Sequence, residues 1–320
     1  MMAAMPNSLA RFRAVVGAGW VVLGVAAVIY ARMKGIPGWA AVPIAAAFLI
    51  EFPFYLLPAF APERLARPWF LAATCVLPYL VYSIPTGEFR VAGFALVAAI
   101  ALIMSYWFVL LPRNGVTDLL FLAAPVAVYL SKVFNSIYLS PVAKIPVPYL
   151  GHVMLIRASV AAIISIRGNA GVEFRFLPTA REWVAGLRWF AILVPLCGLA
   201  LWSLKIANPR PQPHGVFIAA AEVIGIFWMV AMPEEFLFRG LLQQWIERWT
   251  RSTVVALIVA SLLFGGLHLW FHSAFPNWRF AIVAAIAGGC YGMAWRETRS
   301  IQSSMVTHGL AAALFRIFFL

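Results

Sequence analysis

The chain has 320 residues, of which 64% are hydrophobic and only 11% are charged. Soluble domains carry about 25% charged residues, so the composition excludes an ordinary soluble domain. The formal net charge of +13 comes from basic residues scattered over short loops, which is typical of loops beside anionic lipid and does not indicate nucleic-acid binding.

Long apolar runs recur along the whole chain. Runs of about 18 residues or more can cross a hydrocarbon core that is ~30 Å thick. That core offers no water to the backbone, so spanning segments are helices or a closed barrel, and uninterrupted runs without alternation favour helices. The sequence therefore predicts an all-α, polytopic transmembrane helical bundle with about ten to eleven spans. The predicted spans are 14–31, 39–60, 68–84, 92–111, 118–138, 147–166, 185–204, 217–246, 253–271, 279–295 and 301–320.

A polar interruption at residues 167–183 divides these spans into two blocks. Residues 1–180 are predicted to form an N-terminal transmembrane block of about six helices, to which no function is assigned. The weakest span of this block is 147–166, because it contains His152 and Arg157. Residues 181–320 form the second block.

The stretch MPEEFLFRG at residues 232–240 places two acids and an arginine inside a predicted span. Ionisable side chains at membrane depth cost several kcal/mol, so they suggest a functional site. Glu235 and Arg239 are four residues apart on a helix and are predicted to pair. Glu234 points about 100° away, and two carboxylates this close do not both ionise easily in a low dielectric. The pattern predicts one neutralised structural acid and one acid that exchanges protons; the alternative is an ion cluster near the headgroups.

Two histidines lie on later polar-marked helices. His268 is four residues after Phe264 and so lies on the same helix face, while His308 follows a stretch rich in hydroxyl side chains. His272 is spaced to share a metal with His268, but the HExxH pattern is absent. The alternatives are a packing histidine at 268 and a polar, capped helix start at 308.

Glu234, His268 and His308 are predicted to share one cavity near the bilayer midplane, since both histidines fall at similar depth along their spans. A carboxylate and an imidazole can hold and deprotonate a water molecule. A second imidazole can donate to a developing oxyanion. Two further acids, Glu51 and Glu222, are predicted partners for a cation such as Arg316 or Lys132.

The order Glu-Glu-x-x-x-Arg, Phe-x-x-x-His and a third-helix His resembles the CPBP (also called Abi) family, which includes the CAAX prenyl endoproteases. The resemblance covers about residue 185 to the end and implies a CPBP-like intramembrane endopeptidase in residues 181–320. It implies that Glu234 is the general base and that Glu235 and Arg239 order the first motif. It also implies that His268 helps to bind the water and that His308 stabilises the oxyanion.

The resemblance leaves open whether the catalyst is of the glutamic or the metallo type. In the metallo case Glu234, His268 and His308 would hold zinc; otherwise no cofactor is implied. The expected partners are the lipid bilayer and a peptide or protein substrate with a membrane-proximal C-terminal tail. The expected location is a prokaryotic plasma membrane, in which this would be an integral protein.

Position 312 departs from the family pattern, in which His-x-x-x-Asn is usual, because Ala312 takes the place of the asparagine. Losing one oxyanion donor costs on the order of 10²–10³ in rate. A catalytically weak or inactive scaffold or immunity-type protein of the same fold is therefore an alternative. A transporter is a third possibility, because intramembrane charges often mark ion paths, although no inverted repeat is visible.

Overall fold

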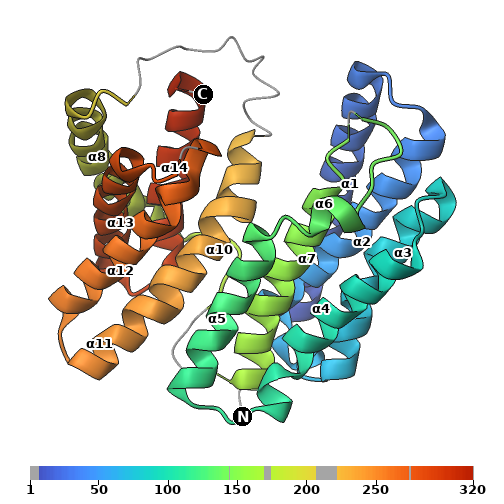
Figure 1. Cartoon of the computed structure of the whole chain (residues 1–320), viewed down its shortest axis with the longest axis horizontal. Coiled ribbons are helices and arrows are strands. Elements are labelled where there is room, and N and C mark those ends of the chain that lie inside the picture. Colours follow the sequence, from blue (N-terminus) through green and yellow to red (C-terminus); the bar gives the residue numbers. More distant parts are fainter. Residues whose placement is uncertain (1–6, 144, 169–173, 207–221, 274, 320) are drawn as a thin grey trace. The chain divides into compact units, whose positions relative to one another are not determined.

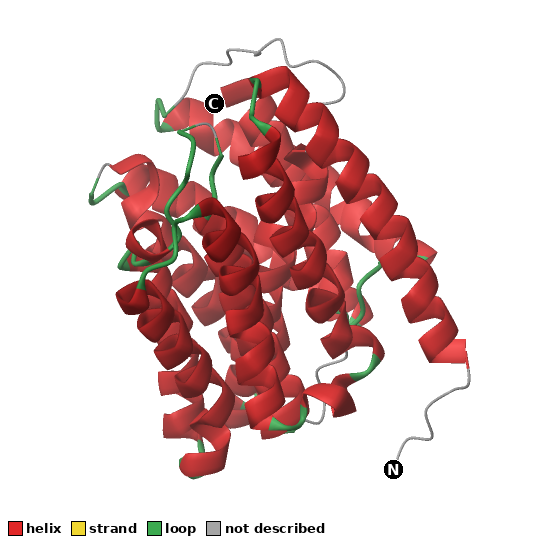
Figure 2. Ribbon diagram, turned by 90° about the vertical axis from the view of Figure 1, so that its right-hand side faces the viewer, coloured by secondary structure: helices red, strands yellow, loops and turns green. Residues whose placement is uncertain are grey.

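A computed structural model describes residues 7–143, 145–168, 174–206, 222–273 and 275–319. Within these ranges every regular element is a helix (Figures 1 and 2). Seven helices of the described residues are long enough and apolar enough to cross a membrane. The prediction of an all-α, polytopic membrane bundle is thus confirmed. The chain divides into two compact units, Met1–Gly171 and Val172–Leu320.

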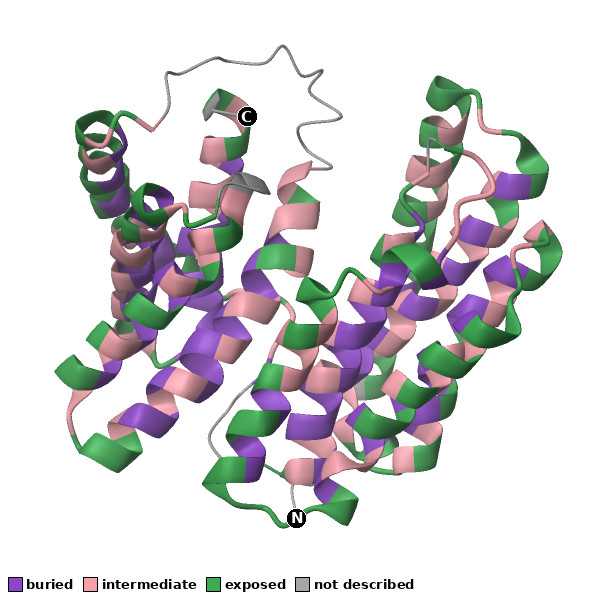
Figure 3. Ribbon diagram, viewed as in Figure 1, coloured by how far each residue is buried: buried purple, intermediate pink, exposed green. Residues whose placement is uncertain are grey.

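The N-terminal unit contains most of the membrane-spanning candidates. Its elements are α1 Asn7–Lys34, α2 Gly38–Phe60, η1 Pro62–Leu65, α3 Pro68–Thr86, α4 Val91–Leu110, α5 Gly115–Leu130, α6 Phe134–Ile137, α7 Pro148–Ala161 and its π-helical continuation η2 Ala162–Arg167. Buried residues gather where these helices face one another, and exposed residues gather on their outer faces (Figure 3).

The predicted span 118–138 is not a single helix. Helix α5 ends at Leu130, and α6 is a separate short helix that begins at Phe134. Between them Lys132 has a left-handed backbone, with φ of 55°, which interrupts the helical hydrogen-bond ladder. The prediction of a continuous helix there was wrong, because the apolar pattern carries no sign of this backbone reversal.

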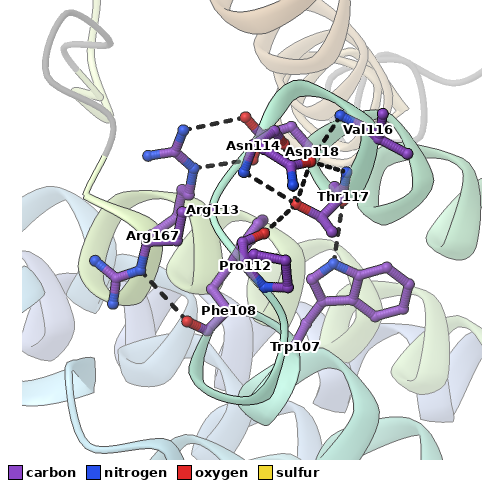
Figure 4. Close-up of polar contacts among 9 residues, drawn as sticks. All are labelled: Trp107, Phe108, Pro112, Arg113, Asn114, Val116, Thr117, Asp118 and Arg167. Carbon is purple, nitrogen blue, oxygen red and sulfur yellow. Dashed lines mark hydrogen bonds and ion pairs between the residues drawn. The ribbon is translucent and has the colours of Figure 1, made fainter.

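The turn that joins α4 to α5 is held by side chains at the start of α5 (Figure 4). Asn114 caps the helix, since its side-chain oxygen accepts hydrogen bonds from the backbone N–H groups of Val116 and Thr117, each 3.0 Å long. Such a capping box satisfies N–H groups that the first helical turn leaves free. Asp118 then accepts two hydrogen bonds from Arg167, of 2.9 and 3.1 Å, which ties α5 to the end of η2.

A buried ion pair joins α2 to α7 in the N-terminal unit. Arg157 donates to both carboxylate oxygens of Glu51, at 2.6 and 3.2 Å, and to the Thr74 hydroxyl of α3 at 3.0 Å. Both charged side chains are almost fully buried. The prediction that Glu51 pairs with a buried cation is therefore confirmed, but the cation is Arg157 and not Arg316 or Lys132. Arg157, which made 147–166 look like the weakest span, lies in the candidate span with the largest buried share, 67%.

The C-terminal unit consists of long helices around the candidate site. Its elements are α8 Ala180–Ser203, η3 Ile226–Ala231, α10 Met232–Glu235, η4 Phe236–Gln243, α11 Gln244–Thr250, α12 Thr253–Leu267, η5 His268–Ser273, α13 Trp278–Thr298 and α14 Ile301–Phe319. The first residues of the predicted span 217–246 lie outside the described residues. Helices α13 and α14 are long but are not among the seven apolar ones. Charged side chains such as Arg279 and Arg296 lower the hydropathy of α13, and Gln302 and His308 lower that of α14.

Helix α8 packs closely against α14 at Gly186. A Cβ atom on Gly186 would meet the Val306 side chain at 2.5 Å and the Ser303 carbonyl oxygen at 2.8 Å. The carbonyl of Gly186 also accepts a 3.0 Å hydrogen bond from the Thr307 hydroxyl. Glycine at this position therefore lets α14 approach the backbone of α8 closely.

Replacing Gly186 by alanine is expected to lower the free energy of unfolding by about 1–3 kcal/mol, because the two helices must move apart. The matched control is Gly198→Ala on the same helix, where a Cβ atom meets nothing within 4 Å. Unfolding of the purified protein in mixed micelles measures both changes. Equal stability of the two variants would contradict the close packing.

Candidate active site

The first motif lies on a continuous helical run from residue 222 to residue 250 that contains two π-helical stretches, η3 and η4. The first of them ends just before Pro233, where the N–H of Met232 bonds to the carbonyl of Phe227 five residues earlier. Proline has no N–H to give and crowds the preceding turn, so a widened turn accommodates it. Stretches of π-helix are frequent at functional sites. Helix α10, with Glu234 and Glu235, lies between the two stretches.

The predicted pair of Glu235 and Arg239 is confirmed. The Arg239 Nη1 atom lies 3.1 Å from Glu235 Oε1, and both side chains are fully buried. The other guanidinium nitrogen, Nη2, donates a 2.7 Å hydrogen bond to the carbonyl of Gly288 on α13. A buried charge needs such partners, because its desolvation is costly. Arg239 therefore neutralises Glu235 and fixes α10 against α13.

His308 on α14 lies between the two glutamates of α10. Its Nδ1 atom is 2.8 Å from Glu235 Oε1, and its Nε2 atom is 3.9 Å from Glu234 Oε2. An ionised carboxylate only accepts hydrogen bonds, so the short contact places a proton on Nδ1. Nε2 then faces Glu234 across a gap that is too long for a direct hydrogen bond. A water molecule that bonds to both atoms would fit beside such a gap.

His268 follows α12, and both His268 and His308 contact the ring of Phe264. The Nδ1 atom of His268 donates to the carbonyl of Phe264 over 2.9 Å, since a carbonyl oxygen only accepts. The Phe264 ring lies 4.7 Å from the His268 ring and 5.6 Å from the His308 ring, between ring centroids. In its neutral form His268 thus keeps Nε2 as a free acceptor.

Two polar atoms of this site have no partner among the described residues. They are Glu235 Oε2 and Arg239 Nε, both buried. Buried polar groups are normally hydrogen-bonded, and ordered water is the usual partner where no side chain serves. The site therefore has the polar lining that water molecules require.

The described residues do not form a set of ligands that fits zinc. No group of three or more His, Cys, Asp and Glu side chains lies together as a metal site in the part of the chain that the structure describes. Tetrahedral zinc needs at least three such protein ligands. The side chain of His272 lies outside the described residues. Zinc bound by Glu234, His268 and His308 stays a prediction.

Several neighbours of the site have no signal in the sequence motifs. Tyr291 of α13 stacks on His308, and the Gly288 carbonyl binds Arg239. In the sequence, these neighbours are marked only by a tyrosine and by closely spaced glycines inside an apolar helix. The predicted pairing of Glu222 with Arg316 is confirmed: Glu222 Oε1 lies 3.3 Å from Arg316 Nε, and the Arg316 side chain is half-exposed.

Fold and site together define a polytopic helical membrane protein with a buried acid, guanidinium and imidazole cluster. Residues 215–314 match the family model described as Rce1-like, type II CAAX prenyl endopeptidase. Over these residues the chain is thus similar to that family, and the recognition of the motifs is confirmed there.

One curated relative adds a bacterial example without a known function. The chain is 30% identical over 111 residues to the uncharacterized protein YpbD of Bacillus subtilis (strain 168). This match covers 35% of the chain and 48% of the relative, so it spans about half of that protein. No solved structure matches the chain.

Proposed function

We propose that the C-terminal unit is an intramembrane endopeptidase that hydrolyses a peptide bond near the C-terminus of a membrane-anchored substrate. The observation that carries the proposal is the position of His308 between two acids, 2.8 Å from Glu235 and 3.9 Å from Glu234. One of these acids is neutralised by Arg239 and the other is not. This division supports a structural role for Glu235 and a proton-transfer role for Glu234.

In the proposed reaction Glu234 takes a proton from water while the water oxygen attacks the substrate carbonyl carbon. His268 holds this water by accepting its second O–H at Nε2. His308 stabilises the oxyanion by donating from Nε2, which requires an imidazole that carries both protons. The carboxylate of Glu235 beside Nδ1 stabilises that positive charge, as the acid of a catalytic triad does. The tetrahedral intermediate then breaks its C–N bond, and Glu234 returns the proton to the leaving amine.

The substrate and the membrane are also part of the proposal. The matching family model supports a peptide substrate with a membrane-proximal tail, and the seven apolar helices support an integral membrane protein. The bacterial relative is in keeping with a prokaryotic plasma membrane.

The proposal is tested by comparing the C-termini of membrane proteins from cells that produce the wild-type chain with those from cells that produce Glu234→Ala or His268→Ala. Proteins shortened at the C-terminus should appear only with the wild type. The amount of each variant in the membrane must equal that of the wild type. Identical C-termini in all three samples would overturn the proposal.

Ala312 favours a second candidate function, that of a non-catalytic scaffold with the same fold. It lies one helical turn after His308 and brings no hydrogen-bond donor. If the chain is an enzyme that lacks one oxyanion donor, Ala312→Asn should raise kcat by a factor of up to about 10²–10³. Ala312→Leu adds similar volume without a donor and is the control. Scaffold function is favoured if neither the wild type nor Ala312→Asn cleaves.

A further inference from the structure

Tyr291 covers the face of the His308 imidazole. Its ring lies on α13, is buried, and is nearly parallel to the imidazole, with 4.5 Å between centroids and 10° between planes. The guanidinium carbon of Arg239 lies 5.3 Å from the same ring, and Phe264 meets it edge-on at 5.6 Å. Tyr291 therefore contacts both partners of Glu235.

The hydrogen bond to Glu235 alone does not determine the orientation of this imidazole. The second side-chain torsion of histidine is broad, so a ring can turn about its hydrogen bond or flip. A parallel aromatic neighbour restricts this motion, because stacked and offset rings have a preferred geometry. With the plane of the ring held and Nδ1 on Glu235, Nε2 of His308 points in one direction, towards Glu234.

The backbone holds Tyr291 in register with His308. Its carbonyl accepts a 2.7 Å hydrogen bond from the hydroxyl of Ser304, which is fully buried on α14. Ser304 precedes His308 by four residues, so both lie on the same face of α14. This hydrogen bond between α13 and α14 thus fixes the position of Tyr291 along α14, opposite the imidazole of His308.

We propose that Tyr291 is a positioning residue that keeps the His308 imidazole in one orientation, with Nδ1 on Glu235 and Nε2 towards Glu234. Its catalytic consequence rests on the proposed endopeptidase function. The orientation of the ring itself does not, and it is measured without any substrate.

The test uses the full chain in lipid vesicles with ¹⁵N-labelled histidine, observed by solid-state NMR. A His308→Gln sample identifies the His308 signals. Wild type and Tyr291→Phe should show one set of signals with a hydrogen-bonded, protonated Nδ1. Tyr291→Leu and Tyr291→Met should show several sets or a shifted proton, and two apolar variants are used in case one does not fold. The control Phe121→Leu removes an equally buried ring from the N-terminal unit and should leave the signals unchanged.

Turnover provides the second measurement. Tyr291→Leu should lower kcat by about 10²-fold with KM unchanged, since a small misplacement of a reacting group costs that much, and Tyr291→Phe should restore most of it. The proposal is overturned if Tyr291→Leu and Tyr291→Met keep the wild-type His308 signals. It is also overturned if Tyr291→Phe loses these signals as Tyr291→Leu does. If wild type cleaves no substrate, the endopeptidase function fails while the NMR result still decides the role of Tyr291.

Discussion

Glu234→Gln is expected to lower kcat by about 10²–10⁴-fold, the usual contribution of a general base. The amide is nearly isosteric with the carboxylate but cannot take a proton from water. Folding should be unaffected, because the Glu234 side chain is 36% exposed and its approach to His308 is long, at 3.9 Å. Cleavage of a fluorogenic membrane-anchored peptide in vesicles measures the effect.

The matched control is Glu297→Gln on α13, whose carboxylate is similarly exposed, at 30%, and pairs with Arg188 at the surface. Exposed ion pairs contribute about 0–1 kcal/mol, so this variant should cleave like the wild type. Loss of cleavage in both variants would point to a general effect of removing an acid. Wild-type cleavage by Glu234→Gln would remove Glu234 from the mechanism.

Contacts within one helix were accessible from the sequence. The spacing of Glu235 and Arg239 predicts their pairing, because side chains four residues apart lie on one helix face. The apolar runs likewise predict nearly all of the helices, since a span must satisfy its own backbone. The backbone reversal at Lys132 was missed because it leaves no mark on the hydropathy.

Contacts between helices were much less accessible. Depth along the spans predicted that Glu234 and His308 lie together, but it did not show that Glu235 shares its carboxylate between Arg239 and His308. That contact depends on how α10 and α14 pack, and the sequence does not state this packing. The same reason explains why Tyr291 was missed.

The ion pair of the N-terminal unit shows the same limit. Glu51 and Arg157 are 106 residues apart, and neither belongs to a motif. In the sequence, the isolated Arg157 only made residues 147–166 a weaker candidate for a membrane-spanning helix. Burial with a bidentate partner reverses that interpretation, because a paired guanidinium can lie inside a bundle where an unpaired one cannot.

Arg157→Leu is expected to destabilise the protein by about 3–5 kcal/mol, because it leaves the Glu51 carboxylate buried without a counter-charge. Glu51→Leu should have a similar effect for the converse reason. The double variant, in which both positions are leucine, should recover most of the lost stability, since replacing a buried pair by apolar residues is often neutral. Unfolding of each variant in mixed micelles measures the free energies.

The double-mutant cycle also decides what the pair does. A double variant that folds and cleaves like the wild type would show that the pair only joins α2 to α7. A double variant as unstable as the single ones would contradict the direct pairing of Glu51 and Arg157. A stable double variant that no longer cleaves would connect the N-terminal unit to the reaction, because only an effect on the site could then explain the loss.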